Sequence, residues 1–114
     1  MDGAESMALT INITYTGAPG AARAFADEMV AAGVVDGIRS EEGNLRYEYF
    51  QPLDDPDSIL LIDSWRDQEA LDAHHASPWM ARIAELRERF DLHMRVERYV
   101  SADDAPQDTS FIRA

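Results

Sequence analysis

The spacing of apolar residues switches between two and about 3.6 along this chain, and the order of these switches constrains the fold more than any other feature. Apolar and polar residues alternate over 8–16, a segment rich in β-branched residues, which predicts a strand. Helical spacing follows over 20–32, and 34–41 predicts a further helical turn or two. Alternation returns in 44–51, and a turn rich in proline and aspartate then leads to 59–65, which predicts a β-hairpin. The second hairpin strand begins apolar on both faces, so we expect it at the centre of the sheet.

The second half of the chain predicts two more helices and a last strand. Asp67 is a good N-cap for a helix that begins at Gln68, and Ser77 followed by Pro78 predicts the cap and first turn of another helix. Alternation over 92–100 predicts the final strand. The order β-α-β-β-α-β is that of the split βαβ or ferredoxin-like plan, an α+β fold in which helices cover one face of a four-stranded antiparallel sheet.

This plan leaves the second face of the sheet without a cover. Two copies can close both open faces by pairing them, so the sequence predicts a homodimer. The side chains expected on this face, Arg46, Glu48, Arg95 and Glu97, are typical neither of a solvent face nor of a core. We expect Arg46 and Glu48 to pair across the dimer rather than to act in catalysis.

The chain of 114 residues has the length of one domain. We expect residues 1–7 to form a flexible leader and residues 8–101 to form the domain. Residues 102–114 predict a polar C-terminal tail, although its last residues include the apolar Phe111 and Ile112.

The charge and residue usage exclude several classes of protein. Ten basic and 22 acidic residues give a net charge of −12, which disfavours nucleic acid and anionic membranes as partners. The sequence has no apolar run of membrane-spanning length and begins without the features of a signal peptide, so the cytoplasm is the expected compartment. Because cysteine and lysine are both absent, thiolate metal sites, cysteine nucleophiles and Schiff bases are excluded, and a general base must be histidine, a carboxylate or tyrosine.

Residues 42–80 resemble the antibiotic biosynthesis monooxygenase family, including its quinol monooxygenase-like members. The segments that carry this resemblance are 43–48, 54–56, 64–65, 70–74 and 76–78. The resemblance implies a dimeric α+β barrel. It also implies relatives of several activities, namely quinol or anthrone oxidation by O₂ without a cofactor, haem degradation, and isomerisation of a phosphorylated signalling sugar.

The function that this resemblance favours is cofactor-independent monooxygenation of a small aromatic quinol or anthrone, with O₂ as co-substrate and no bound metal. Haem is disfavoured because Ala84 stands where the haem-degrading branch has its histidine ligand, and His74 stands where that branch has tryptophan. Two alternatives remain open. One is an isomerase or other proton-transfer enzyme on a small metabolite, such as a phosphorylated one, and the other is a non-catalytic dimer that binds a small ligand.

His74 and Asn12 are the predicted catalytic residues. Histidine titrates near neutral pH, so His74 can take a proton from a phenol, and the resemblance places Asn12 near a site for a hydrogen-bond donor. The structural alternatives are a helix-end histidine bonded to a carbonyl and a strand asparagine that faces solvent or a dimer partner. His75, about 100° further around the helix, is expected on the surface.

Four aromatic residues are predicted to line a substrate pocket in part, and their alternative role is plain core. They are Trp65, Tyr49, Phe50 and Trp79. Two structural observations separate the functions: two or more arginines in the pocket would favour the isomerase, and the lack of a cavity beside His74 would favour the non-catalytic dimer.

Overall fold

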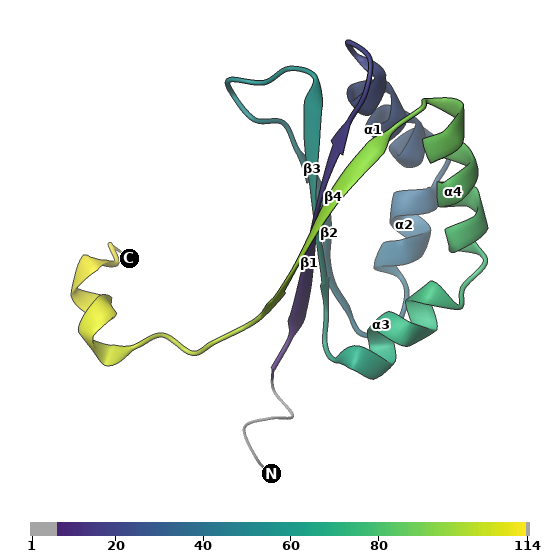
Figure 1. Ribbon diagram of the computed structural model, residues 1–114. Helices are drawn as coiled ribbons and strands as arrows, with labels where there is room; N and C mark the ends of the chain where they lie inside the picture. Colours follow the sequence, from purple (N-terminus) through teal and green to yellow (C-terminus); the bar gives the residue numbers. More distant parts are fainter. Residues whose placement is uncertain (1–6, 114) are drawn as a thin grey trace.

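A computed structural model describes residues 7–113 and confirms the predicted order of elements (Figure 1). The strands are β1 (Leu9–Thr16), β2 (Asn44–Phe50), β3 (Ser58–Trp65) and β4 (His93–Val100). The helices are α1 (Ala21–Ala31), α2 (Val34–Arg39), α3 (Gln68–His75) and α4 (Trp79–Arg89). The fold is therefore the expected ferredoxin-like α+β fold.

The four strands form one antiparallel sheet in the order β2-β3-β1-β4, which confirms the central position predicted for β3. The register is continuous along β1, where Ile11 lies opposite Asp63 of β3 and Arg98 of β4. A bulge at Leu45 shifts the pairing of β2 with β3. This regular register decides which side chains share a level of the sheet, and it positions the site described below.

All four α-helices lie against one face of the sheet, and the opposite face carries no helix (Figure 1). The core fills the space between the two layers. Helix α1 contributes Phe25 and Met29, α2 contributes Ile38, and β3 contributes Leu61, all of which are fully buried. The apolar positions at helical and alternating spacing thus meet at a single interface.

Of the two helix N-caps predicted from the sequence, one is confirmed and one is wrong. Asp67 caps α3 as predicted, because its Oδ1 accepts a hydrogen bond from the backbone N–H of Ala70 at 2.9 Å. The prediction that Ser77 caps α4 is wrong, because Pro78 occupies the N-cap and the side chain of Ser77 is buried without a partner among the described residues. The chain makes a backbone turn from Ser77 to Met80 here, so a side-chain cap is replaced by main-chain bonding.

The C-terminal segment leaves the body of the domain after β4 and ends in a 3-10 helix, η2 (Pro106–Phe111) (Figure 1). Phe111 is 86% exposed, so this apolar side chain finds no burial within its own chain. Of the expected leader, residues 1–6 lie outside the described residues. Within residues 7–113, no helix combines the length and the apolar character needed to cross a membrane.

Candidate active site

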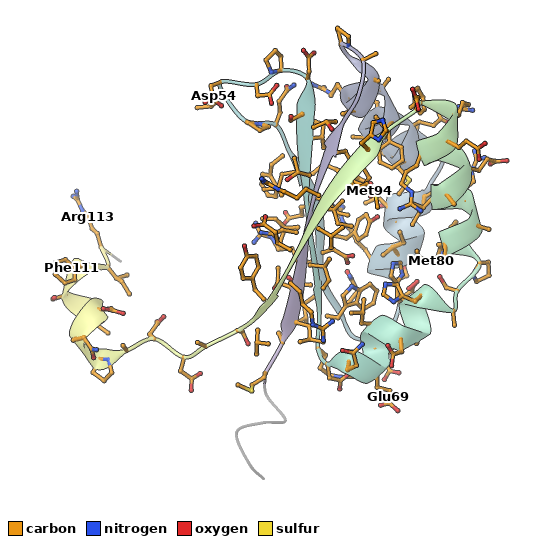
Figure 2. The ribbon with its side chains drawn as sticks, in the orientation of Figure 1. Asp54, Glu69, Met80, Met94, Phe111 and Arg113 are labelled. Carbon is orange, nitrogen blue, oxygen red and sulfur yellow. The ribbon has the colours of Figure 1, made fainter. Side chains whose placement is uncertain are left out.

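A cavity of about 350 Å³ lies between the sheet and helices α3 and α4. Figure 2 shows Met94, on β4, and Met80, on α4, on the two sides of this space. The remaining lining residues are Ile11, Ile13, Tyr15, Tyr47, Leu61, Asp63, Leu71, His74, His75, Ile83, Arg87, Val96 and Arg98. Its size and mostly apolar walls are typical of a site for a small organic molecule.

Most polar side chains of the cavity gather toward one end. Strand register places Tyr47, Asp63, Ile11 and Arg98 side by side across the sheet. Helix α3 adds His74 from its last turn, on the buried side of that helix. The next level of the sheet along the cavity is apolar, and a smaller group of polar side chains lies beyond it, at the level of Tyr15.

His74 is buried at this end of the cavity, with 3% of its surface exposed. Its Nδ1 lies 2.9 and 3.0 Å from the two carboxylate oxygens of Glu41, which belongs to the loop between α2 and β2. An ionised carboxylate can only accept, so Nδ1 carries the hydrogen and donates it. Nε2 is then the ring nitrogen with a free lone pair, which is what a general base requires.

A stacked indole holds the imidazole from the other side. The rings of Trp65 and His74 are 4.6 Å apart at their centroids and inclined by 24°. Trp65 is itself fully buried, and its Nε1–H donates to Oδ1 of Asp63 at 2.6 Å. We call Glu41, His74, Trp65 and Asp63 the histidine network; it fixes both the position and the tautomer of His74.

Burial raises the pKa of Asp63 to about 6, while the hydrogen bond from Trp65 and the nearby His74 lower it. Burial also raises the pKa of Tyr15 to about 12 and that of Tyr47 further. Both tyrosines therefore keep their hydroxyl proton at neutral pH, which makes them hydrogen-bond donors and not bases. The tyrosines are thereby excluded as bases, and His74, which Glu41 orients, is the candidate base of the cavity.

Two of the predicted site residues lie on the opposite face of the sheet. Ile11 and Ile13 line the cavity, and successive side chains of a strand point to opposite faces, so Asn12 points away from it. Phe50 is 39% exposed on the uncovered face, where its ring lies 5.4 Å from the guanidinium carbon of Arg46. The structure thus separates Asn12 and Phe50 from His74, and Asn12 matches its alternative description as a residue of the open face.

The other three predicted aromatics lie on the helix side of the sheet but outside the cavity lining. Trp65 supports His74 from behind. Tyr49 lines a separate pocket near α1. Tyr47, two residues earlier on β2, lines the cavity in place of Tyr49. Trp79 packs on Gly37 of α2, where its ring occupies the space of a β-carbon.

Sequence reasoning missed Asp63, Glu41 and both cavity arginines. Asp63 had a signal, because it stands between Leu61 and Trp65 on the inward-facing side of a central strand, where a carboxylate is unusual. No local sequence pattern pointed to Glu41, since its contact with His74 joins residues 33 apart in the sequence. His75 is exposed as expected, yet it also lies at the cavity, with its ring 5.8 Å from that of His74.

Residues 7–113 contain no group of three or more histidine, aspartate or glutamate side chains placed to hold a metal ion. The same stretch brings together two carboxylates, an imidazole and three tyrosines, and the chemistry that these can supply is proton transfer and hydrogen bonding.

A family model and several known proteins match this chain. The chain matches the family model described as antibiotic biosynthesis monooxygenase over residues 8–86. It is similar to the structure of PA3566 from Pseudomonas aeruginosa, with a TM-score of 0.73 and 30% identity over 87% of this chain and 98% of that chain. It shares its fold with SnoaB, a cofactor-independent oxygenase from Streptomyces nogalater, with a TM-score of 0.67 and 18% identity over 87% and 97% of the two chains. YcnE of Bacillus subtilis (strain 168) is 29% identical over 60 residues, which cover 49% of this chain and less than two thirds (63%) of that protein.

The raised pKa of Asp63 predicts the direction in which the free energy of unfolding changes with pH. Between about pH 4 and pH 6 the folded protein keeps a proton at Asp63 that the unfolded chain has lost, so stability falls as pH rises through this window. Asp63→Asn keeps an oxygen that can accept from Trp65. It should raise the free energy of unfolding by up to about 3 kcal/mol near pH 8 and by little near pH 4.

Urea unfolding of the two proteins at three pH values measures this difference. Asp54→Asn, in the exposed turn between β2 and β3, is the matched control for the loss of one carboxylate (Figure 2). If the Asp63 variant is no more stable than the wild type near pH 8, Asp63 is not a buried ionised group.

Proposed function

The chain belongs to the antibiotic biosynthesis monooxygenase family, and from that premise we propose that it oxidises a small phenolic aromatic compound, of the quinol or anthrone type, with O₂ and without a bound cofactor. The observation that carries this proposal is a buried histidine, hydrogen-bonded by a carboxylate through Nδ1, at the wall of a largely apolar cavity. This arrangement supplies the one proton acceptor that such chemistry needs.

The first step is loss of a proton from the substrate. A phenolic hydroxyl, or the acidic carbon of an anthrone, gives its proton to Nε2 of His74. Glu41 then faces an imidazolium instead of a neutral ring, and its negative charge stabilises the new positive charge. Stacking on Trp65 keeps the ring in place while its charge changes.

The second step is oxidation of the resulting anion. The electron-rich anion transfers one electron to O₂, and the substrate radical and superoxide recombine to form a carbon-bound peroxide. The peroxide takes up the proton and loses water. For an anthrone, a CH₂ group and O₂ become a C=O group and H₂O; for a phenol, a ring C–H, the O–H and O₂ become the two C=O groups of a quinone and H₂O. Arg98, on β4 at the level of Asp63, supplies positive charge near the oxygen anions that form.

The body of the cavity protects these intermediates. Ile13 and Leu61 from the sheet, with Ile83 from α4, form apolar walls beside the polar end. A radical pair in such a site recombines without reaction with water, and an aromatic ring gains favourable burial there.

The isomerase alternative has one observation in its favour, because two arginines, Arg87 and Arg98, line the cavity. Arg98 lies opposite Ile11, whereas Arg87 contacts Met94, which lies opposite Tyr15 at the other end of the strand pair. A phosphate group is held when cationic groups converge on it. The separation of these arginines along the sheet therefore favours the oxygenase.

The open face of the sheet supports the proposal of a homodimer. Asn12 has a side-chain oxygen that is buried and lacks a hydrogen-bond partner among the described residues, and Ile62 lies beside it on β3. Tyr99 and Phe50, on the outer strands, are exposed large side chains on this face. A second copy packed on the same face would cover these groups and give Asn12 a partner.

Oxygen uptake with a panel of quinols and anthrones tests the proposed function. Removal of a general base lowers rates by roughly 10²- to 10⁴-fold, so His74→Gln should lower kcat/KM by at least about 100-fold. Glu41→Gln should lower kcat by about tenfold, because the imidazolium loses its counter-charge. His93→Gln, at the far end of β4 outside the cavity lining, is the matched control. Unchanged turnover in His74→Gln removes this residue from the mechanism.

Light scattering coupled to gel filtration tests the dimer. We expect twice the chain mass of 12.8 kDa at micromolar concentration. Ile62→Glu, which places a charge in the proposed interface, should give the single-chain mass, whereas Leu53→Glu in the exposed turn should not. A wild-type protein that elutes with the mass of one chain contradicts the proposal.

A further inference from the structure

Both arginines that line the cavity lack an acidic partner. Within residues 7–113, neither Arg87 nor Arg98 contacts a carboxylate, although the chain has 22 acidic residues for ten basic ones. The arginines that do pair with a carboxylate are Arg23, Arg46, Arg66, Arg82, Arg89 and Arg95. Arg98 donates instead to the side-chain oxygen of Gln68, whereas Arg87 has no oxygen partner within residues 7–113. In so acidic a chain, a cationic side chain left in this state at a cavity indicates an anion that comes from outside.

Arg87 is the stronger candidate of the two for binding an anion. It lies in the last turn of α4 and is half-buried, and the contact found for its guanidinium is Nη1 to Sδ of Met94, at 3.0 Å. A thioether is a weak acceptor, so this contact leaves most of the hydrogen-bonding capacity of the guanidinium unused. The charge of Arg87 also lowers the pKa of Tyr15 against the effect of burial, which means that its field acts inside the cavity.

The position of Arg87 relative to the histidine network sets the length of a ligand. Arg87 contacts Met94, which lies opposite Tyr15, while Asp63 lies opposite Ile11. The two levels are four residues apart on β1, or about 13 Å at roughly 3.3 Å per residue. Apolar side chains line the interval. A cation thus stands at one end, a base at the other, and apolar walls lie between them.

We propose that the natural ligand is a phenolic aromatic acid, with its carboxylate paired to Arg87 and its hydroxyl at His74. This inference rests on the proposed function and adds the substrate class to it. A planar guanidinium binds a carboxylate through two parallel hydrogen bonds, and the half-buried setting strengthens that pair. The net charge of −12 repels an anion only weakly at this depth, because salt screens exposed charges beyond about 8 Å.

Calorimetric titration of the full-length protein with matched probes tests this substrate class without any turnover. The probes are 6-hydroxy-2-naphthoic acid, its methyl ester and 2-naphthyl phosphate; the first two differ in the charge and in one methyl group at the end away from the hydroxyl. We expect the acid to bind at least about tenfold more tightly than the ester. Arg87→Met should abolish this preference and leave ester binding unchanged, while Arg87→Lys should keep part of it.

Arg82→Met is the control, because Arg82 lies on the same helix, outside the cavity, in an ion pair with Glu85. Equal affinity for acid and ester in the wild type overturns the inference, as does a preference that survives Arg87→Met or disappears in Arg82→Met. Tighter binding of the phosphate than of the acid also overturns it, in favour of a phosphorylated ligand.

The outcome is separable from that of the proposed function. His74→Gln should keep the preference for the acid over the ester, since the charge pair forms at the other end of the cavity. If the acid binds through Arg87 and no quinol or anthrone is oxidised, the ligand class stands and the oxygenase fails. If oxidation depends on His74 but charge at Arg87 has no effect on binding, the oxygenase stands and this inference fails.

Discussion

The hydrogen bond between Glu41 and His74 is the interaction on which the site depends. It joins a loop to the end of a short helix and sets which ring nitrogen carries the hydrogen. Trp65 fixes the plane of the same ring, and Asp63 fixes Trp65. A side chain held on two sides can accept a proton without a change of position, and such preorganisation is what a base in a small cavity requires.

The cavity itself follows from how the helices cover the sheet. Helices α1 and α2 pack closely on the strands, so that Phe25, Met29 and Ile38 are fully buried. The edge strand β4 is covered less well, and Met94 and Val96 remain about half exposed on the helix side. The hollow therefore opens where one layer of a small domain lacks enough side chains to fill it.

The strands and helices were predictable because alternation and helical spacing are local properties, and the structure places each element within a few residues of its expected range. The same alternation places Ile11 and Ile13 inside and Asn12 outside, so the catalytic role predicted for Asn12 conflicted with the strand pattern itself. Alternation along β3 likewise places Asp63 on the inward-facing side, so this residue could have been found from the sequence. Glu41 could not, since its position depends on how the loop after α2 turns through Gly43, whose φ is 84°, and no local pattern encodes that contact.

The tautomer of His74 tests the central claim most directly, because a base at Nε2 requires the hydrogen on Nδ1. Nitrogen-15 NMR of the protein labelled at histidine distinguishes protonated from unprotonated ring nitrogens at neutral pH. We expect Nδ1 of the neutral His74 ring to carry the hydrogen, Nε2 to be unprotonated, and Glu41→Gln to disturb this state. A hydrogen on Nε2 in the wild-type protein, or spectra that Glu41→Gln leaves unchanged, would contradict the account.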